Sequence, residues 1–323
     1  MTKLRNILAA FLAFQLLTHP YVIGRTGLAE LFRPKTEEDV PETEPEEEDF
    51  TPKRGRFAPD RRKKGRHGAE EADGKGGLDT LLSVPCTARE SQSFSWYAPH
   101  HKNGARPASP AEIPSVTEHG GCFLGADEPV VYLTFDAGYE NGNVAKILDT
   151  LKAEKVPGAF FILENLVNRN PELVRRMTDE GHLVCNHTAR HRDMTTFTEA
   201  EFREELGRME TAYRNLTGQD MAPYYRPPEG RFTVENLDWA KDMGYTTVLW
   251  SFAYADWDND RQPSPDASLE KILSGAHNGM VLLLHPTSST NAEILPSLIR
   301  SLRDRGYRFG TLDELTGGGG VDA

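Results

Sequence analysis

The sequence has little cysteine, no excess of basic residues and no long uninterrupted apolar run. Its 323 residues include three cysteines and no CxxC pair, which excludes a disulfide-dense miniprotein and gives no sign of a zinc finger. Acidic residues outnumber Lys and Arg by 49 to 37, for a net charge of −12, which argues against a nucleic-acid-binding protein. Hydrophobic residues make up 38% of the chain, enough for one sizeable core but not for a polytopic membrane protein.

The first 29 residues have the pattern of an export signal or a membrane anchor. Lys3 and Arg5 precede an apolar run at 7–17, which is shorter than the ~20 residues that a spanning helix needs. This arrangement is typical of a secretory signal peptide, and residues 27–29 (GLA) have the small-x-small pattern of a cleavage site. Because that site lies far from the apolar run, an uncleaved anchor and a buried amphipathic helix are alternatives. We therefore expect an extracytoplasmic protein, secreted or membrane-anchored at the cell envelope.

Residues 30–77 predict a disordered linker. Nine acidic residues fall within 37–49 and eight basic residues within 53–66, and prolines occur throughout. Such a segment cannot bury enough apolar surface to offset the entropy of ordering it. The basic block could instead touch anionic lipid or wall polymer.

Irregular sequence flanks the regular part of the chain on both sides. We expect 78–128 to be an irregular extension that packs on the next domain through side chains such as Trp96, and 316–323 to be a flexible glycine-rich tail. Cys86 and Cys122 could form a disulfide across the extension, and Cys185 is expected to be buried and free.

From residue 129 onward, strand-like apolar runs alternate with helical patterns. Length alone suggests about two domains, but this alternation is continuous to about residue 315. Strands are expected at 129–135, 158–163, 182–187, 224–226, 245–252, 280–285 and 307–312. Runs such as PVVYLTF are typical of strands buried on both faces. The pattern predicts an α/β fold with a parallel sheet of about seven strands, either open or closed into a barrel.

Polar residues follow five of these strands at their carboxyl ends, where parallel α/β folds place their active sites. They are Asp136, His187 with His191, Arg226, Asp256 and His285. Each has a purely structural alternative: Asp136 could cap a turn, and Arg226 could pair with Asp256 only to neutralise buried charge. Because five separate strands contribute such residues to one edge of the sheet, we predict a catalytic site there.

The residue types favour hydrolysis with water as the nucleophile. No Ser or Cys lies in a GxSxG-like elbow, whereas Asp136 could take a proton from water and His285 could protonate a leaving group. His187 and His191 could hold a divalent metal that polarises a carbonyl. A glycosidase that uses Asp136 with Glu140 or Glu229 is the main competing class, but it would leave the histidines without a role.

Five short segments resemble, in order, the motifs of the polysaccharide deacetylases, the family-four carbohydrate esterases with a NodB homology domain. The segments are TFDAG at 134–138, HTARH at 187–191, RPPEG at 226–230, DW at 256–257 and LLH at 283–285. The match covers about 129–315, the predicted deacetylase domain. The longer stretch YLTFDAGYENG at 132–142, with Trp96 and residues 123–125, is similar to the delta-lactam-biosynthetic de-N-acetylase branch, which acts on muramic acid in peptidoglycan.

The resemblance implies a deformed (β/α) barrel and hydrolysis of an N-acetyl group from an amino sugar. Its implied substrate is a peptidoglycan glycan strand at muramic acid residues lacking peptide, as in the δ-lactam of spore cortex. The catalytic residues implied are Asp136 as general base, His285 as general acid, Arg226 positioning Asp136 and Asp256 orienting His285. The implied metal ligands are His187 and His191, and the implied substrate-binding residues are Pro228, Glu229, Trp257 and Leu283. No nucleic acid and no obligate protein partner is expected.

One position departs from the family pattern. The family has two adjacent aspartates in its first motif, the second completing an Asp-His-His metal site, and here that position is Ala137. A catalytic zinc usually has three protein ligands and a water, so we expect a divalent metal, zinc by preference, that is weakly held. Either Glu140, Asn141 or waters complete its shell, or Asp136 with Arg226 carries more of the activation.

Two other functions fit the same motifs. The chain could deacetylate another N-acetylated polysaccharide, chitin-like or poly-N-acetylglucosamine, or it could be a catalytically impaired wall-binding module. The departure at Ala137 is the feature that favours the binding module, and the presence of every other motif residue argues against it.

Overall fold

The computed structural model describes residues 92–317. The predicted signal or anchor at 1–29, the linker at 30–77, Cys86 and most of the tail at 316–323 lie outside the described residues. Between residues 92 and 317, no helix is both long and apolar enough to cross a membrane.

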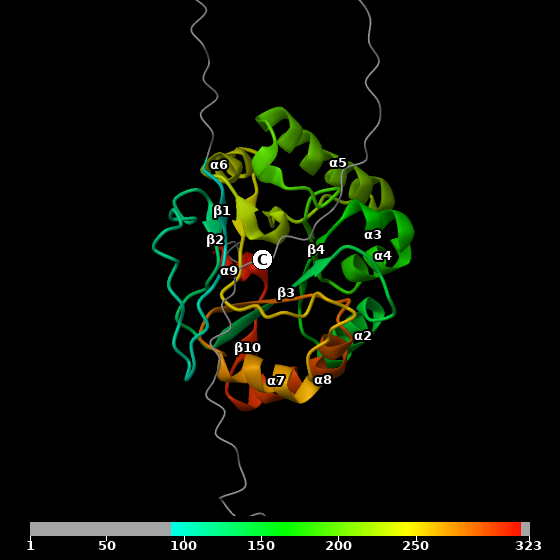
Figure 1. Ribbon diagram of the computed structural model, residues 1–323. Coiled ribbons are helices and arrows are strands. Elements are labelled where there is room, and N and C mark those ends of the chain that lie inside the picture. The colour runs from blue at the N-terminus through cyan, green and yellow to red at the C-terminus, as the bar shows by residue number, and fades with distance from the viewer. Residues whose placement is uncertain (1–91, 318–323) are drawn as a thin grey trace, which may run out of the picture. The chain divides into compact units, whose positions relative to one another are not determined.

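Eight of the described strands form one curled sheet in which neighbouring strands run parallel, with the order β10-β3-β4-β5-β6-β8-β2 and β9 paired to β3 (Figure 1). The strands are β2 (Gly121–Cys122), β3 (Val130–Ala137), β4 (Ala159–Ile162), β5 (Leu183–Asn186), β6 (Tyr224–Tyr225), β8 (Thr246–Val248), β9 (Met280–Leu284) and β10 (Arg308–Phe309). Each of the seven predicted strands has a counterpart, although β8 is shorter than the predicted 245–252, and β2 is an additional strand. The predicted strand at 307–312 ends at Phe309, because Thr311 caps a short helix through the Glu314 N–H.

β3 is the central strand of the described sheet. β9 pairs along one edge, at Val131–Phe135, so β10 and β4 share the other edge, at the beginning and the end of β3. Beyond β8, a parallel bridge joins Phe252 to Leu282 of β9, and the Leu283 N–H donates to the Phe252 carbonyl at 2.9 Å. The sheet therefore curls back on itself, which confirms the deformed barrel.

The helices surround the strands (Figure 1). They are α2 (Val144–Glu154), α3 (Glu164–Arg169), α4 (Pro171–Asp179), α5 (Glu199–Thr217), α6 (Val234–Asp242), α7 (Pro265–Ser274), α8 (Ser289–Asp304) and α9 (Leu312–Leu315). Two of them begin at reciprocal caps: Thr198 with Glu201 precedes α5, and Thr233 with Asn236 precedes α6. Each cap satisfies backbone N–H groups that a helix start leaves without a partner.

Alternate residues of β3 face two different apolar clusters, as the two-residue period of a strand requires. Val131, Leu133, Phe135 and Ala137 pack in the largest cluster, which includes residues from α2, α4 and α8. Val130 and Tyr132 pack in the second cluster. Thr134 and Asp136 follow the second parity, so the fold places their side chains on the face of β3 away from the largest cluster.

The described part of the extension, residues 92–128, contains two short strands. β1 (Phe94–Ser95) pairs antiparallel with β7 (Arg231–Phe232), and β2 pairs with β8. Trp96 is 4% exposed, and its indole N–H donates to the Trp250 carbonyl at 2.9 Å. Cys122 and Cys185 are free, and burial raises the pKa of the Cys122 thiol to about 12.

Candidate active site

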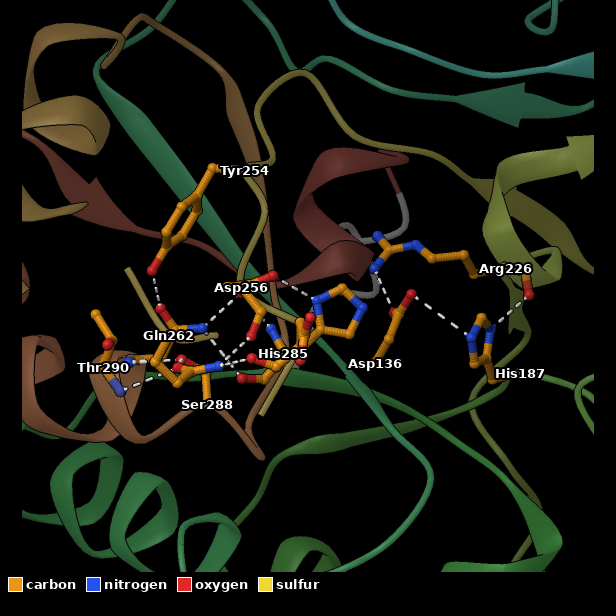
Figure 2. A network of polar contacts seen from close by, with 11 residues as sticks. Asp136, His187, Arg226, Tyr254, Asp256, Gln262, His285, Ser288 and Thr290 are labelled. Atoms are coloured by element: carbon orange, nitrogen blue, oxygen red, sulfur yellow. Dashed lines mark hydrogen bonds and ion pairs between the residues drawn. The ribbon is translucent and has the colours of Figure 1, made fainter. Parts of the chain in front are cut away.

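Asp136 and Arg226 form an ion pair at the carboxyl ends of β3 and β6. The Arg226 Nη1 donates to Asp136 Oδ1 at 2.8 Å, and the Asp136 side chain is 10% exposed (Figure 2). Asp136 lies in β3 directly before Ala137, and Arg226 directly follows Tyr225 of β6. Arg226 thus pairs with Asp136 and not with Asp256, which corrects the structural alternative raised for it.

The rest of the Arg226 guanidinium is held by the barrel interior. Its Nε donates to the Val248 carbonyl at 2.9 Å and its Nη2 to Thr134 Oγ1 at 3.0 Å. The Phe161 ring lies 4.1 Å from the guanidinium carbon, a distance at which a cation–π contact is favourable. Arg226 is completely buried, so these contacts leave its guanidinium one orientation toward Asp136.

Asp256 and His285 form a second pair, on the other side of the site. The His285 Nδ1 lies 2.7 Å from Asp256 Oδ1, and the backbone N–H of His285 donates to Asp256 Oδ2 at 2.8 Å. Asp256 is fully buried, whereas the His285 side chain keeps 25% exposure. Figure 2 shows the His285 ring between Asp256 and Asp136. Because Nδ1 faces a carboxylate, Nε2 is the nitrogen available to a substrate.

The two pairs shift the pKa values of Asp136 and His285 in opposite directions. Burial alone would raise the pKa of Asp136, but Arg226, His187 and His285 outweigh it and hold that pKa below its ordinary value. Burial alone would lower the pKa of His285, but Asp256 outweighs it and raises that pKa above its ordinary value. A carboxylate with a lowered pKa beside an imidazole with a raised pKa is the arrangement that general base and general acid catalysis needs.

His187 and His191 come together as the sequence predicts. Their ring centroids lie 5.0 Å apart, and the His187 Nε2 lies 3.6 Å from Asp136 Oδ2. The His187 Nδ1 lies 2.8 Å from the Arg226 carbonyl, so it carries the proton and leaves Nε2 with a free lone pair. Burial lowers the pKa of His187 to about 4, so the imidazole is neutral at neutral pH.

These two imidazoles are suitable ligands for a divalent cation, but they supply only two donor atoms. A ligand histidine usually donates its second N–H to a backbone carbonyl, as His187 does. Within residues 92–317, however, no three His, Cys, Asp or Glu side chains are grouped to hold a metal. Ala137 is fully buried in the largest apolar cluster and offers only a methyl group. The donor set is therefore a histidine pair without the usual third protein ligand.

Glu140 and Asn141 have other partners. The Glu140 carboxylate accepts the backbone N–H groups of Gly142 and Ala145, and the Asn141 amide donates to the Thr287 carbonyl at 2.8 Å. Among the described residues, no hydrogen bond or ion pair joins Asp136 to Glu140 or Glu229, the partners that a two-carboxylate glycosidase would need.

The predicted substrate-binding residues lie around the two pairs with different exposures. Trp257 is 52% exposed, and its ring centroid lies 6.1 Å from that of His285. Leu283 is buried in β9, in register with Thr134. Pro228 is buried, and the exposed Glu229 has φ 56°, a left-handed conformation that non-glycine residues rarely adopt.

Sequence reasoning gave no role to three residues, of which Thr134 and Asn291 contact predicted site residues and Tyr254 contacts Asn291. Thr134 accepts from Arg226 and donates to the Leu282 carbonyl at 2.9 Å. Its place two residues before Asp136, on the same strand face, was the available signal. Asn291 donates a hydrogen bond to Asp256, and Tyr254 donates one to Asn291. Neither falls in a motif, so only the tertiary structure brings them to the site.

Two comparisons identify the family. Residues 125–248 match the family model described as polysaccharide deacetylase. The chain is also 37% identical over 242 residues to the peptidoglycan-N-acetylmuramic acid deacetylase PdaA of Bacillus subtilis, a match that covers 74% of this chain and 90% of that protein. The chain belongs to the polysaccharide deacetylase family. Membership makes it a carbohydrate esterase-type hydrolase and displaces the glycosidase alternative.

Solved structures of the family have the same fold. The structure of B. subtilis PdaA, described as a family 4 carbohydrate esterase, matches with a TM-score of 0.68 at 36% identity and covers 70% of this chain and 98% of that one. A family 4 pseudoenzyme from Bacillus anthracis matches with a TM-score of 0.56 at 29% identity, covering 60% of this chain and 67% of that one.

Another relative carries a different substrate in its name. A peptidoglycan-N-acetylglucosamine deacetylase of Bacillus cereus is 33% identical over 190 residues, covering 57% of this chain and 67% of that protein. Both of these named relatives modify peptidoglycan, and deacetylases of this family are generally metal-dependent.

Proposed function

We propose that this protein hydrolyses the N-acetyl group of muramic acid residues that lack peptide in peptidoglycan glycan strands. The observation that carries the proposal is the presence of two pairs, one in which Arg226 holds the pKa of Asp136 below its ordinary value and one in which Asp256 raises the pKa of His285. The 37% identity to a muramic acid deacetylase over most of both chains supports the choice of sugar.

The mechanism follows from the form that each pair favours, the carboxylate of Asp136 and the imidazolium of His285. Asp136 accepts a proton from a water molecule as the water oxygen attacks the acetamide carbonyl carbon. His285 then gives its Nε2 proton to the amine nitrogen as the carbon–nitrogen bond breaks, which releases acetate and a free amine. Arg226 keeps Asp136 ionised and oriented, and Asp256 keeps His285 protonated.

The metal has a supporting place in this proposal. His187 and His191 would hold a divalent ion, zinc by preference, and when bound the ion polarises the acetyl carbonyl. Because Ala137 supplies no ligand atom, we expect weak and exchangeable binding. Asp136 and Arg226 accordingly carry more of the activation than in a site with three protein ligands.

Exposed aromatic side chains on the segments that follow Asp136 and Asp256 support a sugar substrate. Trp257 and Tyr139 are 52% and 44% exposed, and the Asn259 amide donates to the Tyr139 hydroxyl, which joins the segment after β3 to the loop that carries Trp257. Flat apolar rings that keep a polar edge suit the faces of a sugar chain. We assign Trp257 and Leu283 to the acetyl pocket and the backbone N–H near Glu229 to the developing oxyanion.

The substrate also implies the compartment and the roles of the chain's parts. Peptidoglycan lies outside the cytoplasm, so we propose that residues 1–29 act as a signal or anchor and that 30–77 tether the deacetylase domain at 129–315. In this arrangement the extension at 78–128 belongs with the catalytic part of the chain.

Product analysis tests the substrate. The full-length protein is incubated with glycan strands stripped of peptide and with intact peptidoglycan, and mass spectrometry locates the lost acetyl groups. Loss from muramic acid in the stripped strands supports the proposal. Loss only from N-acetylglucosamine contradicts it and favours the activity named in the B. cereus relative. Absence of turnover on every glycan favours a catalytically impaired wall-binding module, and a solved relative is itself described as a pseudoenzyme.

A further inference from the structure

The Asp256 carboxylate is held by more than His285. Its Oδ2 accepts a hydrogen bond from the Asn291 Nδ2 at 2.6 Å, in addition to the backbone N–H of His285. Asn291 is completely buried in the first turn of α8, and no sequence motif includes it. A buried amide that donates to a buried carboxylate restricts the positions that the carboxylate can take.

Asn291 also holds the backbone of His285. Its Nδ2 donates to the His285 carbonyl at 3.0 Å, so one amide group bridges the carboxylate and the residue that the carboxylate binds. The two protons of a single side-chain amide are both used in this way. The spacing between Asp256 and His285 therefore depends on Asn291.

Tyr254 fixes which way the amide faces. Its hydroxyl donates to Asn291 Oδ1 (Figure 2 shows Tyr254 beside the network). In the flipped orientation Oδ1 would face the Asp256 carboxylate, two acceptors against each other, so Nδ2 must face it. Burial raises the pKa of Tyr254, which keeps the phenol protonated as a donor.

The network also ties the Trp257 loop to the same helix start. Gln262 donates to the Asp256 carbonyl at 3.0 Å, and its Oε1 accepts the Ser288 hydroxyl (Figure 2). Ser288 in turn caps α8 through the Asn291 backbone N–H at 3.0 Å. The N-terminus of α8 and the 256–262 loop therefore form one hydrogen-bonded unit behind His285.

We propose that Asn291 is a positioning residue of the deacetylation reaction, which fixes the Asp256 carboxylate and through it the ring that protonates the leaving amine. The inference rests on the proposed function for its reaction, but its contacts do not depend on the identity of the sugar. Among the described residues, Asn291 makes no hydrogen bond to His187 or His191, and it meets the site through Asp256 and the His285 backbone.

The charged groups that face His285 give the sign of the effect. Asp256 lies behind the ring, Asp136 faces it from the end of β3, and Arg226 faces it from the end of β6. The neutral Asn291 amide donates a hydrogen bond to Asp256 and so stabilises part of the negative charge of the carboxylate. Removing that donor leaves more of the carboxylate's charge on His285, so the pKa of His285 should rise.

Asn291→Leu in the full-length protein tests the proposal, since leucine has a similar size and no donor. We expect kcat for acetate release to fall about tenfold to a hundredfold, because the ring is no longer fixed, with KM nearly unchanged. The alkaline limb of the kcat profile should move to higher pH. Tyr254→Phe keeps the amide but frees its orientation, so it should shift both quantities in the same direction by less.

Thr290→Val is the matched control. Thr290 neighbours Asn291, is also buried, and donates to the Pro263 carbonyl at 2.7 Å without a hydrogen bond to Asp256 or His285. It should keep the parent kcat and pH profile. Equal losses in Thr290→Val and Asn291→Leu would reduce Asn291 to a structural role, and a parent-like kcat and alkaline limb in Asn291→Leu would overturn the proposal.

Two further measurements apply if Asn291→Leu does not fold or if the parent is inactive. If Asn291→Leu does not fold, Tyr254→Phe decides: an unchanged kcat and limb overturn the proposal. If the parent releases no acetate from any glycan, the proposed function fails, and an NMR titration of the His285 ring still tests Asn291. A pKa of His285 that rises in the variants supports the positioning role, and an unchanged pKa contradicts it.

Discussion

Arg226 and Asp136 are 90 residues apart in the chain, yet the Arg226 Nη1 donates to Asp136 Oδ1 at 2.8 Å and Arg226 has no exposed surface. Burying a guanidinium is costly unless every donor is used. Here a carboxylate, a threonine hydroxyl and the Val248 and Leu249 carbonyls accept four hydrogen bonds from it. The fold thus builds a rigid cationic support behind one carboxylate, which a purely structural role would not require.

Arg226→Lys should abolish most activity while keeping the positive charge. A lysine ammonium is a point charge and cannot reach Asp136, Thr134 and the Val248 carbonyl together. We expect kcat for acetate release to fall about a hundredfold. Arg303→Lys, at an exposed ion pair with Glu154, is the control and should keep the parent kcat. Equal activity in both variants would contradict the positioning role.

Asp256→Asn should shift the alkaline limb of activity to lower pH. Against the effect of burial, Asp256 raises the pKa of His285, and the reaction needs the protonated ring, so activity is lost as pH rises through that pKa. Without the carboxylate the limb should move down by about one unit or more. The measurement is kcat/KM against pH, and an unmoved limb would contradict the assignment of His285 as the acid.

The same pair predicts how stability depends on pH. A histidine whose pKa is raised by folding stabilises the folded state fully below its ordinary value of 6.5, and this contribution is lost as pH rises through the raised pKa. Asp256→Asn should therefore cost more unfolding free energy at pH 6 than at pH 9. Denaturant titrations at the two pH values measure the difference, and equal costs at both would count against the coupling.

Ala137→Asp tests whether a carboxylate at the family's ligand position can turn out of the apolar cluster toward His187 and His191. Zinc should bind the variant more tightly than the parent, because three protein ligands replace two. Without metal, the new carboxylate lies in an apolar cluster and should destabilise the fold by about 3–5 kcal/mol. Calorimetric zinc titration and thermal unfolding with and without chelator are the measurements. Unchanged zinc affinity would mean that a carboxylate at position 137 does not reach an ion held by His187 and His191.

Trp257→Ala should weaken substrate binding without affecting the fold. The side chain is 52% exposed, so its loss should change the unfolding free energy by less than about 0.5 kcal/mol. We expect KM for glycan strands to rise about three- to tenfold. Tyr97→Ala, which removes an aromatic side chain of 47% exposure on the extension, should leave KM unchanged. A similar KM for all three proteins would remove Trp257 from the site.

Much of the fold could be predicted because buried parallel strands have a distinctive sequence pattern. β3, β4 and β9 are continuous apolar runs, and the polar residues at the ends of β3 and β9 are visible against them. β1 and β2 are two residues each and pair with β7 and β8, far along the chain. Strands that short have no periodicity, so their pairing depends on tertiary contacts that no local pattern records.

The site residues also divide into those that the sequence predicts and those that it does not. Asp136, Arg226, Asp256 and His285 could be predicted because each follows a strand and belongs to a family motif. Asn291 could not, because its role comes from the packing of α8 against the 256–262 loop. The sequence at a helix start predicts the cap. It does not predict which carboxylate an amide in the first turn will contact.

The central claim is that Asp136 and His285 hydrolyse an N-acetyl group at this site. The most direct measurement is acetate release from peptide-free glycan strands by the full-length protein and by Asp136→Asn, with strand binding measured in parallel. We predict turnover by the parent, a fall of about 10²- to 10⁴-fold in the variant, and similar binding by both. Turnover by the variant at the parent's rate, or no turnover by either protein, would contradict the claim.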